Sequence, residues 1–264
     1  MKLTWFDANS WLIESAGKRI LIDPWLVGDL VFSGLNWFIK GTRSQPIPIP
    51  ENIDLILLSQ GLPDHAHPET LQQLDKSIPI IASPDGAQVA SKFGYQSVTA
   101  LEHGDSWQAP QESSLRGLTV QTFVGAPVGV TKKENAYVVT FAEQDGLRLY
   151  YEPHGYPDTK HLQTIGRVDV AITPMSDMTI LGVAPVIRST AVNVAELLRP
   201  QVMLPTAEAG SVSYEGALSG ALRTTAGAET VRSQLQEKGF DIQVIEPASR
   251  ETVELDLRPL VNAT

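Results

Sequence analysis

IDLILLSQGLPDHAHPETL, residues 53–71, passes from an apolar run through a polar loop into a helical pattern. The run IDLILL is continuous, which is typical of a strand that is covered on both faces. Pro68 opens PETLQQLDK, and proline is tolerated in the first turn of a helix. The loop between them carries Asp64, His65 and His67, three groups that can bind a metal or move a proton. The sequence therefore predicts a strand, a loop with candidate site residues and a helix in direct succession.

Strands and helices alternate in the rest of the chain as well. Short strands such as KLTWF, SWLIES and KRILID precede this stretch, and further strands follow it. The patterns predict helices over 68–76, 86–93, 189–199 and 227–238. The order runs from β-rich to α/β twice, which favours a four-layer αββα sandwich over one parallel sheet covered by helices. No linker rich in Gly, Ser or Pro divides the chain, so we expect residues 1–264 to form a single domain.

The composition limits the classes of protein that need to be considered. Apolar residues make up 42% of the chain and charged residues 19%, as in an ordinary globular protein. The net charge of −10 argues against binding nucleic acid through a broad basic face. No apolar run is long enough to predict a transmembrane segment, and the N-terminus MKLTWFDANSWLIE shows no secretory pattern. The chain has no cysteine, which excludes thiolate metal sites and fits a reducing compartment, so we expect a cytoplasmic protein.

The segment WLVGDLVFSGLNWFIKG, residues 25–41, is rich in aromatic side chains and is broken by glycines. The glycines argue against a regular helix. A long apolar loop beside a site commonly covers a pocket or meets a partner, and the alternative is that it covers its own core. We expect Trp25, Trp37 and Phe38 to contact a small-molecule ligand with a large apolar part. The same segment is a candidate contact for a protein or a membrane surface.

Several segments resemble the metallo-β-lactamase superfamily, in the order in which that family has them. The pattern S-Q-x-L-x-D-H-x-H at 59–67 resembles its metal-binding loop, usually S/T-H-x-H-x-D-H. The other segments are KRILIDPWL, LRLYYEPHGY, VDVAITPM and AVNVAELLRPQVMLPT. The branch most resembled contains the ascorbate-phosphate lactonase and other single-domain hydrolases, and the loop variant resembles a cyanobacterial and plastid subgroup of that branch. The resemblance implies the αββα sandwich and a metal-dependent hydrolase.

The resemblance also implies which metal ligands this chain has lost. The usual site of the family holds two metal ions with five histidines and two aspartates. Gln60 and Leu62 replace the first two histidines of the loop, and residues 125–129 offer no ligand for the same ion. Ala207 stands at the last histidine of the family, and His154 stands at the aspartate that bridges the two ions. The usual two-metal site with its bridging hydroxide is therefore not expected.

The ligands that remain are Asp64, His65 and His154, which can hold one metal ion with open positions. Zn²⁺, Mn²⁺ or Fe²⁺ would suit this set, and the ion would leave as the histidines protonate below about pH 6.5, their usual pKa. Asp64 or the neighbouring His67 would carry the proton in hydrolysis. The alternative is structural: Asp64 begins a turn, and the histidines lie on loops without a metal.

Two hypotheses of different class remain open at this point. The first is a small-molecule hydrolase with one metal at Asp64, His65 and His154. The second is a non-catalytic binding or assembly protein that has kept the fold and lost the metals. His154 favours the first hypothesis, whereas Leu62 and Ala207 favour the second.

Overall fold

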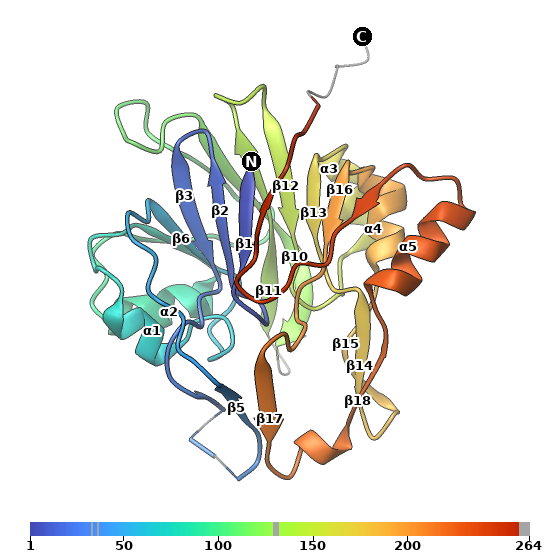
Figure 1. Cartoon of the computed structure of the whole chain (residues 1–264). Helices are drawn as coiled ribbons and strands as arrows, with labels where there is room; N and C mark the ends of the chain where they lie inside the picture. Colours follow the sequence, from blue (N-terminus) through green and yellow to red (C-terminus); the bar gives the residue numbers. More distant parts are fainter. Residues whose placement is uncertain (33, 36, 129–131, 259–264) are drawn as a thin grey trace.

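Two seven-stranded sheets lie face to face at the centre of the molecule (Figure 1). The structure, a computed structural model, describes residues 1–32, 34–35, 37–128 and 132–258. The first sheet has the strand order β20-β1-β2-β3-β6-β7-β8. Its strands are β1 (Lys2–Trp5), β2 (Trp11–Ser15), β3 (Lys18–Ile22), β6 (Leu55–Leu58), β7 (Ile80–Ala82), β8 (Val98–Ala100) and β20 (Thr252–Glu254).

The second sheet has the order β19-β16-β13-β12-β11-β10-β9. Its strands are β9 (Ser106–Gln108), β10 (Leu118–Val128), β11 (Lys132–Phe141), β12 (Leu147–Tyr151), β13 (Val170–Ile172), β16 (Val202–Leu204) and β19 (Gln243–Val244). In both sheets, antiparallel hairpins form one part and parallel strands joined by helices form the other.

The main apolar core lies between the sheets, because side chains of both contribute to one buried cluster. Strand β6 shows how the sequence builds it. Leu55 and Leu57 point into this core, whereas Ile56 and Leu58 point to the outer face of the first sheet. All four side chains are fully buried. The uninterrupted apolar run of this strand is therefore the consequence of burial on both faces.

Helices cover the outer face of each sheet (Figure 1). On the first sheet they are α1 (Pro68–Gln73) and α2 (Pro84–Lys92). On the second sheet they are α3 (Thr159–Ile165), α4 (Ala191–Leu198) and α5 (Ala228–Glu237). The predicted αββα sandwich is confirmed, and the four predicted helices are found as α1, α2, α4 and α5. Helix α3 was not predicted, because its sequence TKHLQTI is polar and buries only Leu162 and Ile165.

Two three-stranded sheets extend the sandwich at one end, the lower end in Figure 1. One contains β4 (Leu30–Val31), β5 (Lys40–Arg43) and β17 (Val212–Glu215). The other contains β14 (Ser176–Ile180), β15 (Ala184–Ile187) and β18 (Leu222–Ala226), and a short 3₁₀ turn at Ser219–Ala221 leads from β17 to β18. None of the helices in the described part of the chain is both long enough and apolar enough to cross a membrane.

Candidate metal centre

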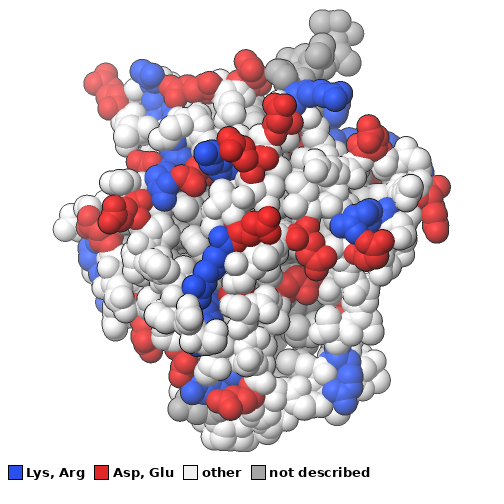
Figure 2. Space-filling model, viewed as in Figure 1, with Lys and Arg blue, Asp and Glu red and all other residues white. Residues whose placement is uncertain are grey.

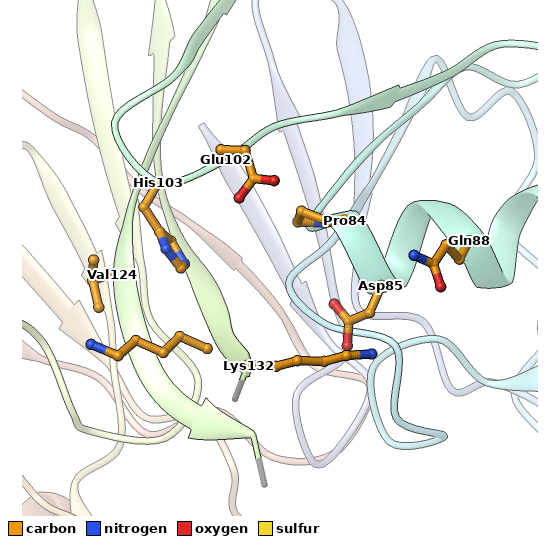
Figure 3. Close-up of a pocket in the computed structure, with 8 residues that line it drawn as sticks. Pro84, Asp85, Gln88, Glu102, His103, Val124 and Lys132 are labelled. Carbon is orange, nitrogen blue, oxygen red and sulfur yellow. The ribbon is translucent and has the colours of Figure 1, made fainter. Parts of the chain in front are cut away.

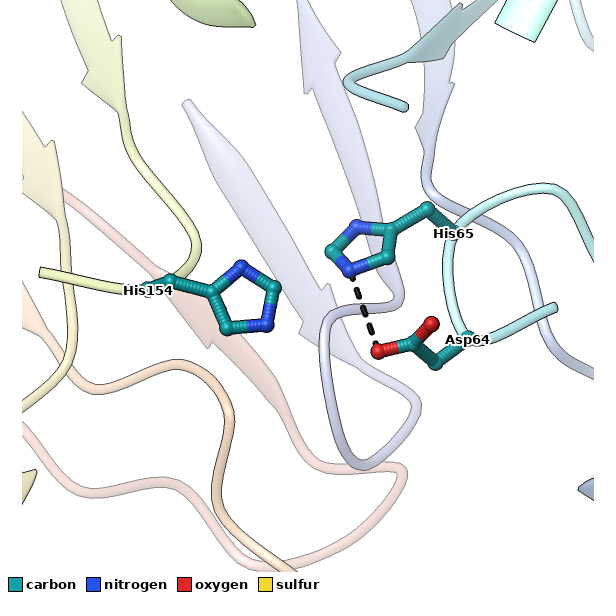
Figure 4. A group of neighbouring side chains, drawn as sticks. All are labelled: Asp64, His65 and His154. Atoms are coloured by element: carbon teal, nitrogen blue, oxygen red, sulfur yellow. Dashed lines mark ion pairs between the residues drawn. The ribbon is translucent and has the colours of Figure 1, made fainter. Parts of the chain in front are cut away.

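The candidate site lies where β6 and β12, one strand from each sheet, run out into loops. The loop after β6 carries Asp64 and His65, and the loop after β12 carries His154. One potential ligand atom from each of these side chains lies within 4.8 Å of the others. Figure 4 shows the three side chains turned toward one another from opposite sides of the sandwich. The structure thus brings together the three residues that the sequence predicted as metal ligands.

His65 is fully buried, and hydrogen bonds fix the orientation of its ring. Its Nδ1 lies 2.7 Å from Asp23 Oδ2 and 2.9 Å from Ser59 Oγ. Asp23 also accepts hydrogen bonds from the Ser59 backbone N–H (2.7 Å), the Ser59 hydroxyl (2.5 Å) and the Tyr151 hydroxyl (2.7 Å). A carboxylate that accepts the Nδ1 proton leaves Nε2 as the nitrogen available to a metal. That nitrogen lies 3.1 Å from Asp64 Oδ2.

His154 is held in the same way by a different carboxylate. Its Nδ1 lies 2.7 Å from Glu134 Oε2, on β11. The same oxygen accepts a hydrogen bond from Gln60 Nε2 at 3.0 Å, and Glu134 Oε1 accepts one from the Ala126 backbone N–H at 3.0 Å. The rings of His154 and His65 lie 5.0 Å apart between centroids. Each histidine therefore has a buried carboxylate on Nδ1, the arrangement that commonly orients a metal-binding imidazole.

Charges within the cluster shift the pKa of all three candidate ligands. Burial opposes a charged imidazole, but Asp64 and Asp23 outweigh it and hold the pKa of His65 well above its usual value. Burial likewise opposes a charge on His154, but Glu134 outweighs it and raises that pKa. For Asp64, burial acts to raise the pKa, but the two histidines outweigh it and lower the pKa. Asp64 is therefore ionised at neutral pH, and a metal has to displace protons from the imidazoles.

Glu152 closes the loop that carries His154. Its carboxylate accepts the backbone N–H groups of His154 (3.2 Å), Gly155 (2.7 Å) and Tyr156 (3.1 Å), and burial raises its pKa to about 7. Gly155 has a φ of +76°, and a Cβ at this position would lie 1.6 Å from the carbonyl oxygen of Arg188. Only glycine allows the loop to close against the end of β15 in this conformation.

Two buried oxygens beside the cluster have no hydrogen-bond partner among the described residues. They are Asp64 Oδ1 and Gln60 Oε1. A buried polar atom without a partner is rare and commonly marks a missing water or ion. One of these oxygens belongs to a candidate ligand, and oxygen together with imidazole nitrogen is a donor set that Zn²⁺, Mn²⁺ and Fe²⁺ accept. The residues present therefore fit one divalent cation.

The structure does not bring His67 into the cluster. His67 is the N-cap of α1, and its Nδ1 accepts the Thr70 backbone N–H at 3.4 Å. Its Nε2 lies 3.2 Å from the Asp29 carbonyl oxygen, to which it can donate. Burial lowers the pKa of His67, in keeping with a neutral ring. Both ring nitrogens are thus occupied away from Asp64.

A cavity of about 370 Å³ opens onto the site. Its polar residues are Gln60, Asp64 and His154, and the rest of its lining is mostly apolar. The apolar and aromatic residues are Phe32, Leu62, Ala126, Pro127, Val128, Tyr156, Pro185 and Val186. Residues 126–128, at the end of β10, thus supply cavity wall although none of them can bind a metal.

The aromatic residues expected to contact a ligand take different places. Trp25 is fully buried in a small core beside β4 and β17, where the Arg43 guanidinium lies 3.7 Å from the centre of its ring. Trp25 does not line the cavity. This residue therefore covers the protein's own core, which was the alternative to ligand contact. Trp37 and Phe38 are exposed, by 68% and 39%. Phe32, from the same segment, is the aromatic residue that reaches the cavity.

Ala207, which stands at the family's last histidine, has a left-handed backbone with a φ of +61°. Its backbone N–H donates to the Ala8 carbonyl oxygen at 3.0 Å. The neighbouring Asn9 places its Nδ2 3.3 Å from His65 Nε2. The amides of Asn9 and Gln60 therefore stand beside His65, where this chain lacks further histidines.

Sequence reasoning missed Asp23 and Glu134 as the partners of the two histidines. Asp23 directly follows β3, and a polar residue at the end of an apolar strand is a usable signal. Glu134 gives no such signal, because KKEN reads as an exposed charged stretch although Glu134 itself is fully buried.

A second cavity, of about 450 Å³, lies beside the start of α2 (Figure 3). His103 lines it, and His103 Nε2 lies 3.1 Å from the Glu134 carbonyl oxygen, so this cavity stands behind the site. Its carboxylates include Asp85, which accepts the Gly61 backbone N–H at 3.1 Å. Charges of both signs line it, and it contains no group of three clustered metal ligands among the described residues.

Known proteins resemble the chain in sequence. The model of a family described as "Beta-lactamase superfamily domain" matches residues 2–207. A UPF0173 metal-dependent hydrolase from Chelativorans sp. (strain BNC1) is 27% identical over 180 residues, which is 64% of this chain and 64% of the relative's length. Another from Agrobacterium fabrum (strain C58) is 24% identical over 189 residues, 69% of this chain and 76% of the relative.

Solved structures resemble the fold over almost the whole chain. An isothiocyanate hydrolase from Delia radicum gut bacteria matches with a TM-score of 0.68 and 17% identity, covering 97% of this chain and 99% of that one. A metallo hydrolase from Ignicoccus hospitalis matches with a TM-score of 0.67 and 16% identity at the same coverage. At these identities the likeness shows the fold alone.

Proposed function

The chain belongs to the metallo-β-lactamase superfamily, and on that basis we propose that it is a metal-dependent hydrolase with one divalent ion at Asp64, His65 and His154. The observation that carries the proposal is the matched support of the two histidines. Asp23 and Glu134 each take the Nδ1 of one ring, and the ligand atoms of the three residues meet within 4.8 Å. Unrelated loop histidines have no reason to share this arrangement.

A single ion is proposed because no second ligand set is present among the described residues. Gln60 stands where the family has a histidine, and its Nε2 donates to Glu134 Oε2 at 3.0 Å. Leu62 lines the cavity and Ala207 carries only a methyl group, and neither can bind a metal.

A divalent ion bound here would act as a Lewis acid and lower the pKa of a water molecule. The residues of the chain contribute orientation and proton transfer. Asp23 and Glu134 hold the two rings, and Glu152 holds the loop of His154. Asp64 is ionised and lines the cavity, so we assign it the role of proton acceptor. We assign His67 to helix capping, because both of its ring nitrogens are engaged there.

The cavity wall supports a small, uncharged and partly apolar substrate. Among the residues that the structure describes, the lining contains no Lys or Arg side chain that could pair with a phosphate or carboxylate group. Its apolar wall suits an aliphatic or aromatic portion, while Gln60, Asp64 and His154 mark the polar end at which the bond would be cleaved.

Metal uptake tests the proposal most directly. Protein purified without chelator is analysed for bound metal, and the apoprotein is titrated calorimetrically with Zn²⁺, Mn²⁺ and Fe²⁺ at neutral pH. We expect about one ion per chain. His154→Ala should abolish binding, since the two remaining ligands come from one loop. Asp64→Asn should abolish it as well, because the only carboxylate of the set is lost and two imidazoles remain. His161→Ala is the matched control, because His161 is an exposed histidine on α3 whose ring pairs only with Asp158.

The competing function is a non-catalytic binding protein, and one observation favours it. His65 Nε2 already contacts the amide nitrogens of Gln60 (3.0 Å) and Asn9 (3.3 Å), so the ring is satisfied without a metal. If the purified protein holds no metal and takes up none of the three ions, the hydrolase proposal fails and this function replaces it.

A further inference from the structure

The large apolar side chains that the described residues expose lie at the end of the molecule that carries the two three-stranded sheets and the cavity mouth. They are Leu35, Trp37, Phe38, Leu62, Leu181, Val183 and Val186. Leu181 and Val183, in the β14–β15 turn, are 71% and 80% exposed. Exposed apolar side chains gathered at one end of a molecule mark an interaction site.

Six of these side chains, all except Leu62, lie in a surface that we call the apolar crown and define as the described residues of 30–39 (30–32, 34–35 and 37–39) together with residues 178–187 and 216–222. Backbone hydrogen bonds join the three segments. The Ala217 N–H donates to the Trp37 carbonyl oxygen at 2.9 Å, and the Leu218 N–H donates to Phe38 at 2.8 Å. At the other end of the 216–222 segment, the Ala221 carbonyl oxygen accepts the Leu181 N–H at 2.7 Å. The 216–222 segment thus connects the two apolar tips.

The crown segments themselves contain no ionisable residue, in a protein whose net charge is −10. The exposed Arg223 directly follows them, and its guanidinium donates to the Gly220 and Leu222 carbonyl oxygens at 2.8 and 2.7 Å. Its segments read LVFSGLNWFI, MTILGVAPVI and GALSGAL. In Figure 2 the lowest edge of the molecule is mainly white, and blue and red residues lie just above it. At its border Lys40 pairs with Asp29 at 2.8 Å and lies 3.9 Å from Glu215, so these three groups carry one net negative charge, and the positive charge of Arg223 balances it. The surface is thus apolar and close to neutral.

We propose that the apolar crown docks on the surface of a neutral, zwitterionic lipid bilayer. A bilayer accepts apolar side chains from separate projecting tips without a matching surface shape, whereas a protein partner needs one. Trp37, at 68% exposure, is the residue type that favours the interface between lipid and water. The acidic chain gives no attraction to anionic lipids, so burial of apolar side chains has to drive the docking.

The docking does not depend on the proposed hydrolase activity, but the crown and the cavity share residues. Phe32, Pro185 and Val186 belong both to the crown and to the cavity wall. A docked molecule would therefore hold the mouth of the cavity at the lipid surface.

Flotation with phosphatidylcholine vesicles tests the docking without any assay of activity. We expect the protein to float with these vesicles, with no gain from added phosphatidylserine and no loss in about 1 M salt, which screens surface charges. In vesicles of brominated phosphatidylcholine, Trp37 should be quenched. Trp37→Phe should remove this quenching, and Trp107→Phe, a change on β9 away from the crown, should leave it intact.

Charge insertion gives the second test. Leu181→Asp and Val183→Asp should each weaken vesicle binding at least about tenfold, because a carboxylate does not enter the lipid layer. Gln108→Asp adds the same charge at an exposed position on β9 and should bind like the unaltered protein. Circular dichroism checks that all three variants are folded.

Three results would overturn the proposal. The first is no flotation with phosphatidylcholine at millimolar lipid. The second is flotation that requires phosphatidylserine and disappears in salt. The third is a stable dimer in analytical ultracentrifugation that Leu181→Asp dissociates, which would assign the crown to contact between two copies of the chain.

Discussion

Glu134 is the residue on which His154 and Gln60 both depend, since one carboxylate oxygen contacts both. Glu134→Gln keeps the shape of the side chain and removes its charge. We expect the affinity for Zn²⁺ to fall about 10- to 100-fold, as is usual when the partner of a metal-binding histidine is changed. Calorimetric titration measures the change. Glu102→Gln, an exposed carboxylate beside the second cavity, should leave the affinity unaltered.

Metal affinity should depend on pH in a range set by the raised pKa of His65 and of His154. Below its pKa each ring is protonated and cannot bind a metal, so affinity falls as the pH falls through that value. The usual pKa of histidine is about 6.5. Because the pKa of each of the two rings is raised, metal affinity should begin to fall while the pH is still above that value. Titration with Zn²⁺ between pH 6 and pH 9 checks this, together with proton release on binding at pH 7.

The metal-free protein should show the opposite trend in stability. The raised pKa of His65 stabilises the fold while the ring is charged, and that contribution is lost as the pH rises through the folded-state value. A metal-free chain that became more stable over the range in which its metal affinity rises would contradict the pairing of His65 with Asp23 and Asp64.

Restoring the two lost loop histidines should not create a two-metal enzyme. In Gln60→His with Leu62→His, Glu134 still lies beside position 60, and Ala207 still carries no ligand. We expect the double variant to bind no more than one ion per chain and to show no gain in hydrolysis of simple esters or lactones. Elemental analysis that found two tightly bound ions would refute the ligand count.

The candidate ligands could be predicted because they lie in recognisable segments, next to strands and prolines. Their partners could not. Asp23 and Glu134 are 42 and 20 residues away in sequence from the histidines they contact. The pairing of strands brings them together, β3 with β6 in the first sheet and β11 with β12 in the second. A lone glutamate after two lysines resembles a solvent-exposed position. Trp25 was misplaced for the same reason, since its burial depends on β17, far along the chain.

At the scale of elements, the loop after β12 and strand β15 meet at Gly155. Gly155→Ala should lower the free energy of unfolding by more than about 2 kcal/mol, because the new Cβ would collide with the Arg188 carbonyl oxygen and the left-handed backbone adds strain. It should also weaken metal binding, because His154 would move. Gly182→Ala is the control: it has a similar φ of +73° but free space around the Cβ, so only the strain of about 1 kcal/mol remains.

Thermal unfolding followed by circular dichroism measures both variants. Equal losses of stability for the two would show that the contact between Gly155 and Arg188 does not position the loop.

The elements with strong periodicity or clear boundaries were predicted from the sequence, and the others were not. Helix α2 was predicted over 86–93 from the Gly94 that follows it, whereas it begins two residues earlier, at Pro84 after the N-cap Ser83. Helix α3 has none of the apolar spacing that separates a short helix from a loop. The β14–β15 turn was also missed, since MTILGVAPVI reads as core and the exposure of Leu181 is set by the way β18 pairs with β14.

At the scale of the whole molecule, stability should come from the core between the sheets and not from the crown. Leu57 is fully buried in that core, whereas Leu181 is 71% exposed. Leu57→Ala should cost about 2–5 kcal/mol of unfolding free energy, and Leu181→Ala less than about 0.5 kcal/mol. Urea unfolding measures both. A large cost for Leu181→Ala would mean that the crown is a structural part of the fold.

The overall architecture was the most predictable property of the chain. The order of apolar strands and helices in two similar halves sufficed for the αββα sandwich, because few arrangements bury that many apolar faces. The site formed at the end of the sandwich was less predictable, since half of its residues come from each sheet.

That division of the site between the sheets ties metal supply to the lifetime of the protein. An ion held by His65 from one layer and His154 from the other would resist their separation, and a ligand that binds only the folded chain raises its stability by mass action. Cells degrade proteins in proportion to the fraction that is unfolded. A cell short of the metal would then lose the protein itself as well as its activity, and its abundance would report how much of that metal the cell contains.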